Sequence, residues 1–408
     1  MKTPLRILAS AVILSQLPSV GWSKGSDQEN EDWRNRMRTL STQFEELLID
    51  LSVPSRFDQP KFKSTIQTHA DRLAQLAHEI GVDQNQDQSS RIYAQALKED
   101  AEHGAAMLKA GHRAYARNIL RGVSASCVAC HSRMPGLEFG APSAPTAASV
   151  ELMKTLPSEE KLQYLSATRR FDEAVQEAEE LLKNKSLRAK DPIAWEKSVR
   201  QGIALLVRVK ENPELAMGWL ERLLTDPDTP EFLRIDARAW MRSLKQWKQE
   251  TSQQLTPKKS TETEASLWKK IDSLQKKARA EQAYPADRSA DMDWMRVASL
   301  LTRFFREYPS SPRIADALLL QGTTEEALRS NEAWGLSESF YTACIRVSPH
   351  SETARKCYRS LEEKVLLGWT GSAGVDVPED VEMRLGELRS LSAPEKNAPP
   401  SPSLPAKP

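Results

Sequence analysis

The sequence predicts an all-α protein, in which a four-helix bundle is followed by helical hairpins stacked as an α-solenoid. Nearly every segment of the 408 residues spaces its apolar side chains three and four positions apart, which is the repeat of an amphipathic helix. No segment alternates apolar and polar residues as a half-buried strand does. Stretches rich in Pro, Ser, Thr and Ala separate the helical segments and divide the chain into three units.

Residues 1–23 predict a secretory signal peptide. Lys2 and Arg6 precede an apolar run, and Gly21 and Ser23 are small residues at the expected cleavage site. Polar residues interrupt the run, which is too short for a stable membrane span; an uncleaved N-terminal anchor is the alternative. We therefore expect an exported, periplasmic protein that has no stable membrane span after cleavage.

The charge balance favours no polyanionic partner. Lys and Arg number 57 against 56 for Asp and Glu, so the formal net charge is +1. A strongly basic chain would be expected for a protein that binds nucleic acid. We therefore expect no nucleic-acid partner.

Two of the four cysteines predict a disulfide. Export places the cysteines in an oxidising compartment. Cys344 and Cys357 flank a Ser-Pro-His-Ser turn at similar distances, so an antiparallel helical hairpin would bring them together. Two unrelated buried thiols are the alternative.

The first unit, residues 28–140, predicts four antiparallel helices with short connections. Each helix carries one apolar stripe, and the stripes cover residues 33–51, 62–80, 89–111 and 115–130. Helices of this kind bury their stripes together as a bundle. We expect the fourth helix to direct its cysteines into the interior of that bundle.

The rest of the chain predicts helical hairpins. In order, it divides into a linker at 141–150, hairpins at 151–250, a linker at 251–264, hairpins at 265–391 and a disordered Pro-rich tail at 392–408. The segments "RRFDEAVQEAEELLKN" and "FREYPSSPRIADALLLQG" resemble tetratricopeptide-repeat helices, although no fixed period runs through several repeats.

The segment "SASCVACHSRMPG", residues 124–136, carries the chemistry. Cys127, Cys130 and His131 project from one face of a helix, because they lie three and four positions apart. Two thiols at this spacing can add to the vinyl groups of a haem while the imidazole binds its iron. A zinc site would need a second pair of ligands, and a thioredoxin-type site would need a βαβ context. The motif therefore predicts one covalently attached c-type haem.

A helical unit with CxxCH near the end of its last helix and an Arg-rich, Met-bearing first helix resembles the class II c-type cytochromes, the cytochrome c′ and c556 group. This resemblance implies that Cys127 and Cys130 form the thioethers and that His131 is the fifth iron ligand. It also implies that Met37, in "WRNRMRTL", is the sixth ligand. The resemblance covers residues 28–140 only, and the long C-terminal extension departs from it.

The sixth ligand of the iron has three possibilities, which are Met37, His69 or no protein side chain. Met37 occupies a regular position of an apolar stripe, where methionine ordinarily fills the core. His69 interrupts the stripe of the second helix, and it either binds iron or forms a hydrogen bond inside the bundle. Without either ligand, the site is open. Five arginines are candidates to pair with the haem propionates, or else lie on solvated faces: Arg34, Arg36, Arg38, Arg113 and Arg133.

These residues predict electron transfer rather than enzymatic catalysis. Iron with His and Met ligands exchanges one electron and has no position left for a substrate. The helical hairpins would dock a redox partner protein, either periplasmic or membrane-bound. With an open sixth position, the chain would be a gas-binding or sensing haem protein. With a structural haem, it would be an envelope scaffold.

Overall fold

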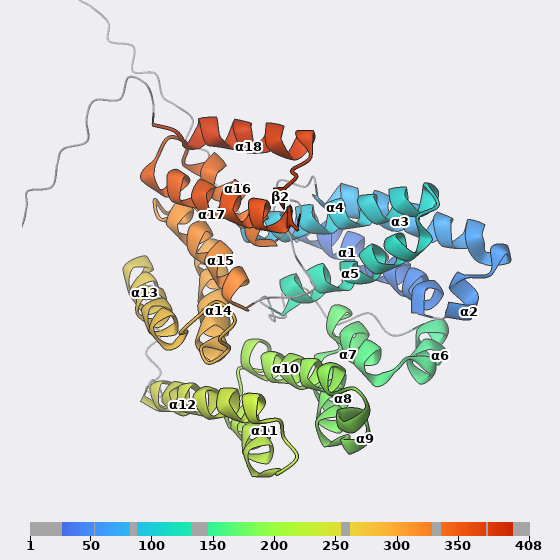
Figure 1. Ribbon diagram of the computed structural model, residues 1–408, viewed down its shortest axis with the longest axis horizontal. Coiled ribbons are helices and arrows are strands. Elements are labelled where there is room, and N and C mark those ends of the chain that lie inside the picture. Colours follow the sequence, from blue (N-terminus) through green and yellow to red (C-terminus); the bar gives the residue numbers. More distant parts are fainter. Residues whose placement is uncertain are drawn as a thin grey trace, which may run out of the picture.

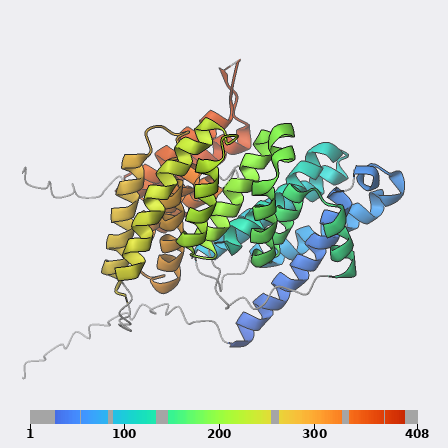
Figure 2. The ribbon, with the colours of Figure 1, turned by 90° about the horizontal axis from the view of Figure 1, so that it is seen from below.

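The computed structural model describes residues 27–52, 54–81, 88–132, 146–253, 262–328, 336–372 and 374–394. These ranges are almost entirely helical, which confirms the all-α class. The strands within them are β1 (Thr370–Gly371) and β2 (Gly374–Val375), which pair antiparallel and project as a hairpin (Figure 2). The predicted signal peptide lies outside the described residues. No helix in these ranges combines the length and apolar character needed to cross a bilayer.

Four long helices form the first part of the fold: α1 (Asp27–Ser52), α3 (Lys63–Gly81), α4 (Gln88–Lys109) and α5 (Arg113–His131). The short α2 (Pro54–Phe57) and the 3-10 turn η1 (Pro60–Phe62) join α1 to α3. α4 packs against both α3 and α5, and α1 packs against α3 (Figure 1). The predicted stripes supply the core, since Leu47, Ile66, Leu73 and Leu120 are fully buried.

The next helices pack mainly on their neighbours in sequence. In chain order they are α6 (Ala147–Thr155), α7 (Ser158–Ala167), α8 (Phe171–Lys183), α9 (Lys185–Lys190), α10 (Pro192–Arg208), α11 (Pro213–Thr225) and α12 (Glu231–Gln253). The N-cap residues of α9, α10 and α11 are Asn184, Asp191 and Asn212, and each accepts a hydrogen bond from a backbone N–H three residues on. The caps explain why these helices start where they do.

Part of the predicted linker at 141–150 is helical instead. Residues 141–145 lie outside the described residues, whereas 147–150 belong to α6. Thr146 Oγ1 accepts a hydrogen bond from the Ser149 N–H at 3.0 Å, and the buried Ser149 hydroxyl donates to Glu45 of α1 at 2.7 Å. This second contact is tertiary, so composition could not reveal it.

The last helices return to the first ones. They are α13 (Glu264–Glu281), α14 (Asp291–Glu307), α15 (Ile314–Leu328), α16 (Leu336–Val347), α17 (Glu352–Gly368) and α18 (Glu379–Ser392). Both α14 and α16 contact α4 (Figure 1). Tyr93 of α4 and Phe340 of α16 pack edge to face, with ring centroids 5.6 Å apart.

The other predicted boundaries fall partly outside the described residues. Of the linker at 251–264, residues 254–261 are not described, while 251–253 end α12. Thr263 caps α13 by accepting a hydrogen bond from the Ser266 N–H at 3.3 Å. Of the tail at 392–408, residues 395–408 are not described.

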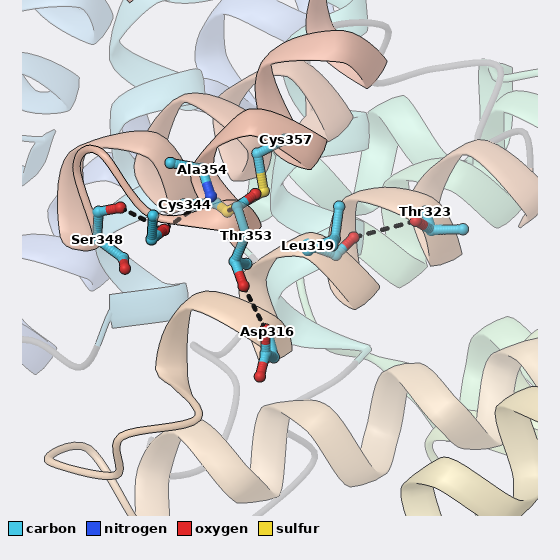
Figure 3. Close-up of a disulfide and its surroundings, with 9 residues drawn as sticks. Asp316, Leu319, Thr323, Cys344, Ser348, Thr353, Ala354 and Cys357 are labelled. Carbon is cyan, nitrogen blue, oxygen red and sulfur yellow. Dashed lines mark hydrogen bonds between the residues drawn. A yellow bond between two sulfur atoms is a disulfide. The ribbon is translucent and has the colours of Figure 1, made fainter. Parts of the chain in front are cut away.

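The predicted disulfide is confirmed (Figure 3). Cys344 of α16 and Cys357 of α17 are both buried, with their Sγ atoms 1.96 Å apart. The turn between the helices is fixed locally, because the Ser351 hydroxyl donates to the carbonyl oxygen of Ser348 and accepts from the N–H of Ala354. The two helices therefore form the antiparallel hairpin that the Ser-Pro-His-Ser turn predicted.

Candidate functional site

A mainly apolar cavity brings the four predicted site residues together. Met37 of α1 and Cys127, Cys130 and His131 of α5 all line it. Its apolar walls come from α1, α3 and α4 and include Trp33, Leu40, Phe44, Leu73, Tyr93 and Leu97. The helical spacing of the motif directs its three side chains to one side of this cavity, because α5 continues to His131 without a break.

The two cysteines of the motif are thiols outside any disulfide. Burial among the apolar walls raises the pKa of Cys127 to about 12. A thiol in this state is a poor nucleophile, whereas a redox-active CxxC cysteine needs a lowered pKa. The environment of Cys127 therefore disfavours disulfide exchange at this motif.

His131 is held by a backbone carbonyl. Its Nδ1 lies 3.2 Å from the carbonyl oxygen of Ala167, the last residue of α7. A carbonyl oxygen only accepts hydrogen bonds, so Nδ1 carries the proton and Nε2 keeps its lone pair. Burial lowers the pKa of His131 to about 4, and the nearby Arg169 contributes. The imidazole is therefore neutral, which is the form that binds a metal.

His69, the alternative sixth ligand, is engaged elsewhere. Its Nδ1 lies 2.9 Å from Oδ2 of the fully buried Asp50, which also accepts a hydrogen bond from Arg56. His69 does not line the cavity. The structure therefore gives His69 the role of a hydrogen-bonded histidine between α1 and α3.

The five candidate arginines separate into two groups. Arg34 and Arg38 line the cavity. Arg36 lies over the Trp33 ring at 5.9 Å, and Arg113 donates to the carbonyl oxygen of Phe57. Neither Arg36 nor Arg113 lines the cavity. The fifth candidate, at position 133, lies outside the described residues.

One wall of the cavity comes from residues that the sequence assigned to a different unit. Ala167, Thr168 and Arg169, at the end of α7, line it beside His131. Local sequence carries no signal for this contact, because α7 reaches α5 only through tertiary packing.

One of the residues that line the cavity carries a buried polar atom. Trp33 lines the cavity and is 5% exposed, yet its indole Nε1 finds no acceptor among the described residues. A buried indole N–H ordinarily has a hydrogen-bond partner. An acceptor group bound in the cavity would satisfy it.

Comparisons of this chain with family models, with curated proteins and with solved structures found no match. Within the described ranges, no group of three or more His, Cys, Asp or Glu residues is placed to hold a bare metal ion. Haem iron takes four ligands from the porphyrin and at most two from the protein. The cavity and its lining residues are therefore the features that bear on function.

Proposed function

We propose that the chain is an exported, periplasmic c-type cytochrome that carries one haem and transfers single electrons. The observation that carries this proposal is that Met37 and the three motif residues line one apolar cavity. Methionine and histidine are the axial pair of electron-transferring c-type cytochromes. Helix α1 supplies the methionine and α5 the histidine, so the pair is formed only when these helices pack together.

The residues around the cavity fit a covalently attached haem. Cys127 and Cys130 would form the thioether bonds, and His131 offers a neutral Nε2 while Nδ1 is occupied by a backbone carbonyl. The unsatisfied Trp33 N–H would find an acceptor in a haem propionate. Arg34 and Arg38 bring positive charge to the same cavity.

Each group has a defined task in this proposal. The bound haem supplies one-electron exchange at its iron. His131 and Met37 would hold that iron, and the Ala167 carbonyl orients the His131 ring. The apolar walls limit the access of water to the cavity, so water would compete less with His131 and Met37 as ligands. No group at the cavity is assigned to substrate chemistry.

The class II cytochrome bundle and the α-solenoid belong to the same proposal. Helices α1, α3, α4 and α5 would be the bundle, which their mutual packing supports. The pairwise packing of the helices from α7 onward supports stacked hairpins. These hairpins would dock the redox partner protein.

Covalent haem is the first test. The full chain, expressed with export and haem attachment, is expected to gain the mass of one haem that survives denaturation. Replacing both Cys127 and Cys130 by Ser should abolish this mass. The matched control replaces Cys344 and Cys357, which lie in α16 and α17. Wild-type protein without attached haem would overturn the proposal.

The second test identifies the sixth ligand. Wild-type protein is expected to show a low-spin spectrum that does not change with carbon monoxide. Met37→Ala should open the iron to carbon monoxide, while Met107→Ala should not, because Met107 packs on the core without lining the cavity. A wild-type protein that binds carbon monoxide at once would instead identify the gas-binding alternative.

A further inference from the structure

The turn between α7 and α8 has a defined hydrogen-bond pattern. The N–H of Arg170 donates to the carbonyl of Leu165 at 2.8 Å, and the N–H of Arg169 donates to that of Ser166 at 3.2 Å. This pair of bonds is the Schellman ending of a helix. It satisfies two of the last carbonyls of α7 but not that of Ala167, which accepts from His131 instead.

The turn places an arginine where glycine is favoured. Arg169 has a φ of 62°, in the left-handed region that a Schellman ending requires at this position. A side chain with a Cβ is strained there, and glycine is not. A strained residue at a candidate functional site points to a use for its side chain.

The side chain of Arg169 lies at the cavity. It lines the cavity beside Cys130 and His131, and its charge interacts electrostatically with both of them. Its neighbour Arg170 turns away, since it pairs with Glu173 at 2.7 Å and does not line the cavity. The turn therefore presents one cation to the cavity and one to the surface of α8.

We infer that Arg169 places a fixed positive charge beside His131, in the cavity that would hold the haem, and thereby raises the reduction potential of the bound haem. This inference rests on the proposed function. Oxidised haem carries one more positive charge than reduced haem, so a nearby cation disfavours the oxidised state, and low polarity strengthens the effect. A residue that follows α7 would thus influence the potential of a haem attached to α5.

The test is Arg169→Gly in the full, haem-loaded protein. We expect the equilibrium constant for reduction to fall about tenfold, which corresponds to a potential lower by about 59 mV for one electron. Thermal stability should be equal or higher, because glycine fits the left-handed conformation without strain. Arg169→Lys should keep most of the potential. A residue that only shaped the turn would change stability and leave the potential alone.

Two control variants separate the effect of the Arg169 charge from the effect of its left-handed backbone conformation. Glu211→Gly relieves another left-handed residue, with a φ of 46°, at an exposed position away from the cavity. Arg170→Gln removes a cation from the same turn without touching the cavity. Both should leave the potential unchanged. An unchanged potential in haem-loaded Arg169→Gly overturns this inference alone, whereas protein without haem overturns the proposed function and the inference with it.

Discussion

The Nδ1 atom of His131 lies 3.2 Å from the carbonyl oxygen of Ala167, across a sequence separation of 36 residues. This hydrogen bond joins the end of α5 to the end of α7. It occupies Nδ1 of His131 and leaves Nε2 available to bind a metal. It also means that a cavity formed largely by α1, α3, α4 and α5 is completed by a later segment. The proposed haem site is therefore not confined to residues 28–140.

The role of His131 can be tested by chemical rescue. In His131→Gly the haem should stay attached through Cys127 and Cys130, but the low-spin spectrum should be lost because the iron lacks its fifth ligand. Added imidazole should restore the low-spin spectrum by binding in the vacated space. Visible spectra recorded across an imidazole titration provide the measurement.

His69→Ala is the matched control for that experiment. The spectrum should be unchanged, since His69 does not line the cavity. The free energy of unfolding should fall by about 1–3 kcal/mol, because the buried carboxylate of Asp50 loses one hydrogen-bond partner while keeping Arg56. A changed iron spectrum in His69→Ala would instead identify His69 as an iron ligand.

The disulfide should contribute to stability without affecting the haem. It closes a short loop, with a sequence separation of 13 residues. Replacing Cys344 and Cys357 by Ala should lower the free energy of unfolding by about 3 kcal/mol, as expected for a loop of this size. Urea denaturation measures this change, and the visible spectrum should stay that of the wild type. Equal unfolding free energies for the two proteins would contradict the prediction.

A buried carboxylate predicts a pH dependence of stability. Burial raises the pKa of Asp291 from its ordinary value of 3.8 to about 7, although Arg200 and Arg288 lie 3.8 and 3.7 Å from its Oδ2. Between these pH values the folded chain binds a proton that the unfolded chain has released. The contribution of Asp291 to stability is therefore present below about pH 4 and is lost as the pH rises through 7.

Asp291→Asn isolates this contribution. The free energy of unfolding of the wild type minus that of the variant should decrease from pH 4 to pH 7, by an amount on the order of a few kcal/mol. Other titrating groups cancel in this difference. Urea denaturation at a series of pH values measures it, and a difference that is independent of pH would exclude Asp291 as the source.

Close packing between α10 and α11 depends on a glycine. A Cβ at Gly202 would lie 2.5 Å from the Trp219 ring and 2.7 Å from the side chain of Ala178. Gly202→Ala should therefore lower the free energy of unfolding by about 1–3 kcal/mol. Gly218→Ala, in the middle of α11 with open space around it, should raise it by about 0.5–1 kcal/mol. Denaturation midpoints of the two variants should move in opposite directions.

Much of the fold was predictable because the determining interactions are local. Apolar stripes with helical spacing predicted α1, α3, α4 and α5 to within a few residues, since a helix must bury one face. The disulfide between Cys344 and Cys357 was also predictable, because a short turn between two antiparallel helices brings residues on either side of it together. The helical start of α6 was missed, because it depends on the tertiary contact of Ser149 with Glu45.

The sequence by itself determined which residues are candidates for the chemistry of the site. Cys127, Cys130 and His131 share a helical face through their spacing alone, and Met37 lies on an apolar stripe. Only the tertiary structure decided that Met37 faces the same cavity, and that Ala167 and Arg169 close it. The physical reason is range: helical periodicity acts over a few residues, whereas a helix end satisfies its last carbonyls with whatever donor the packed chain brings to it.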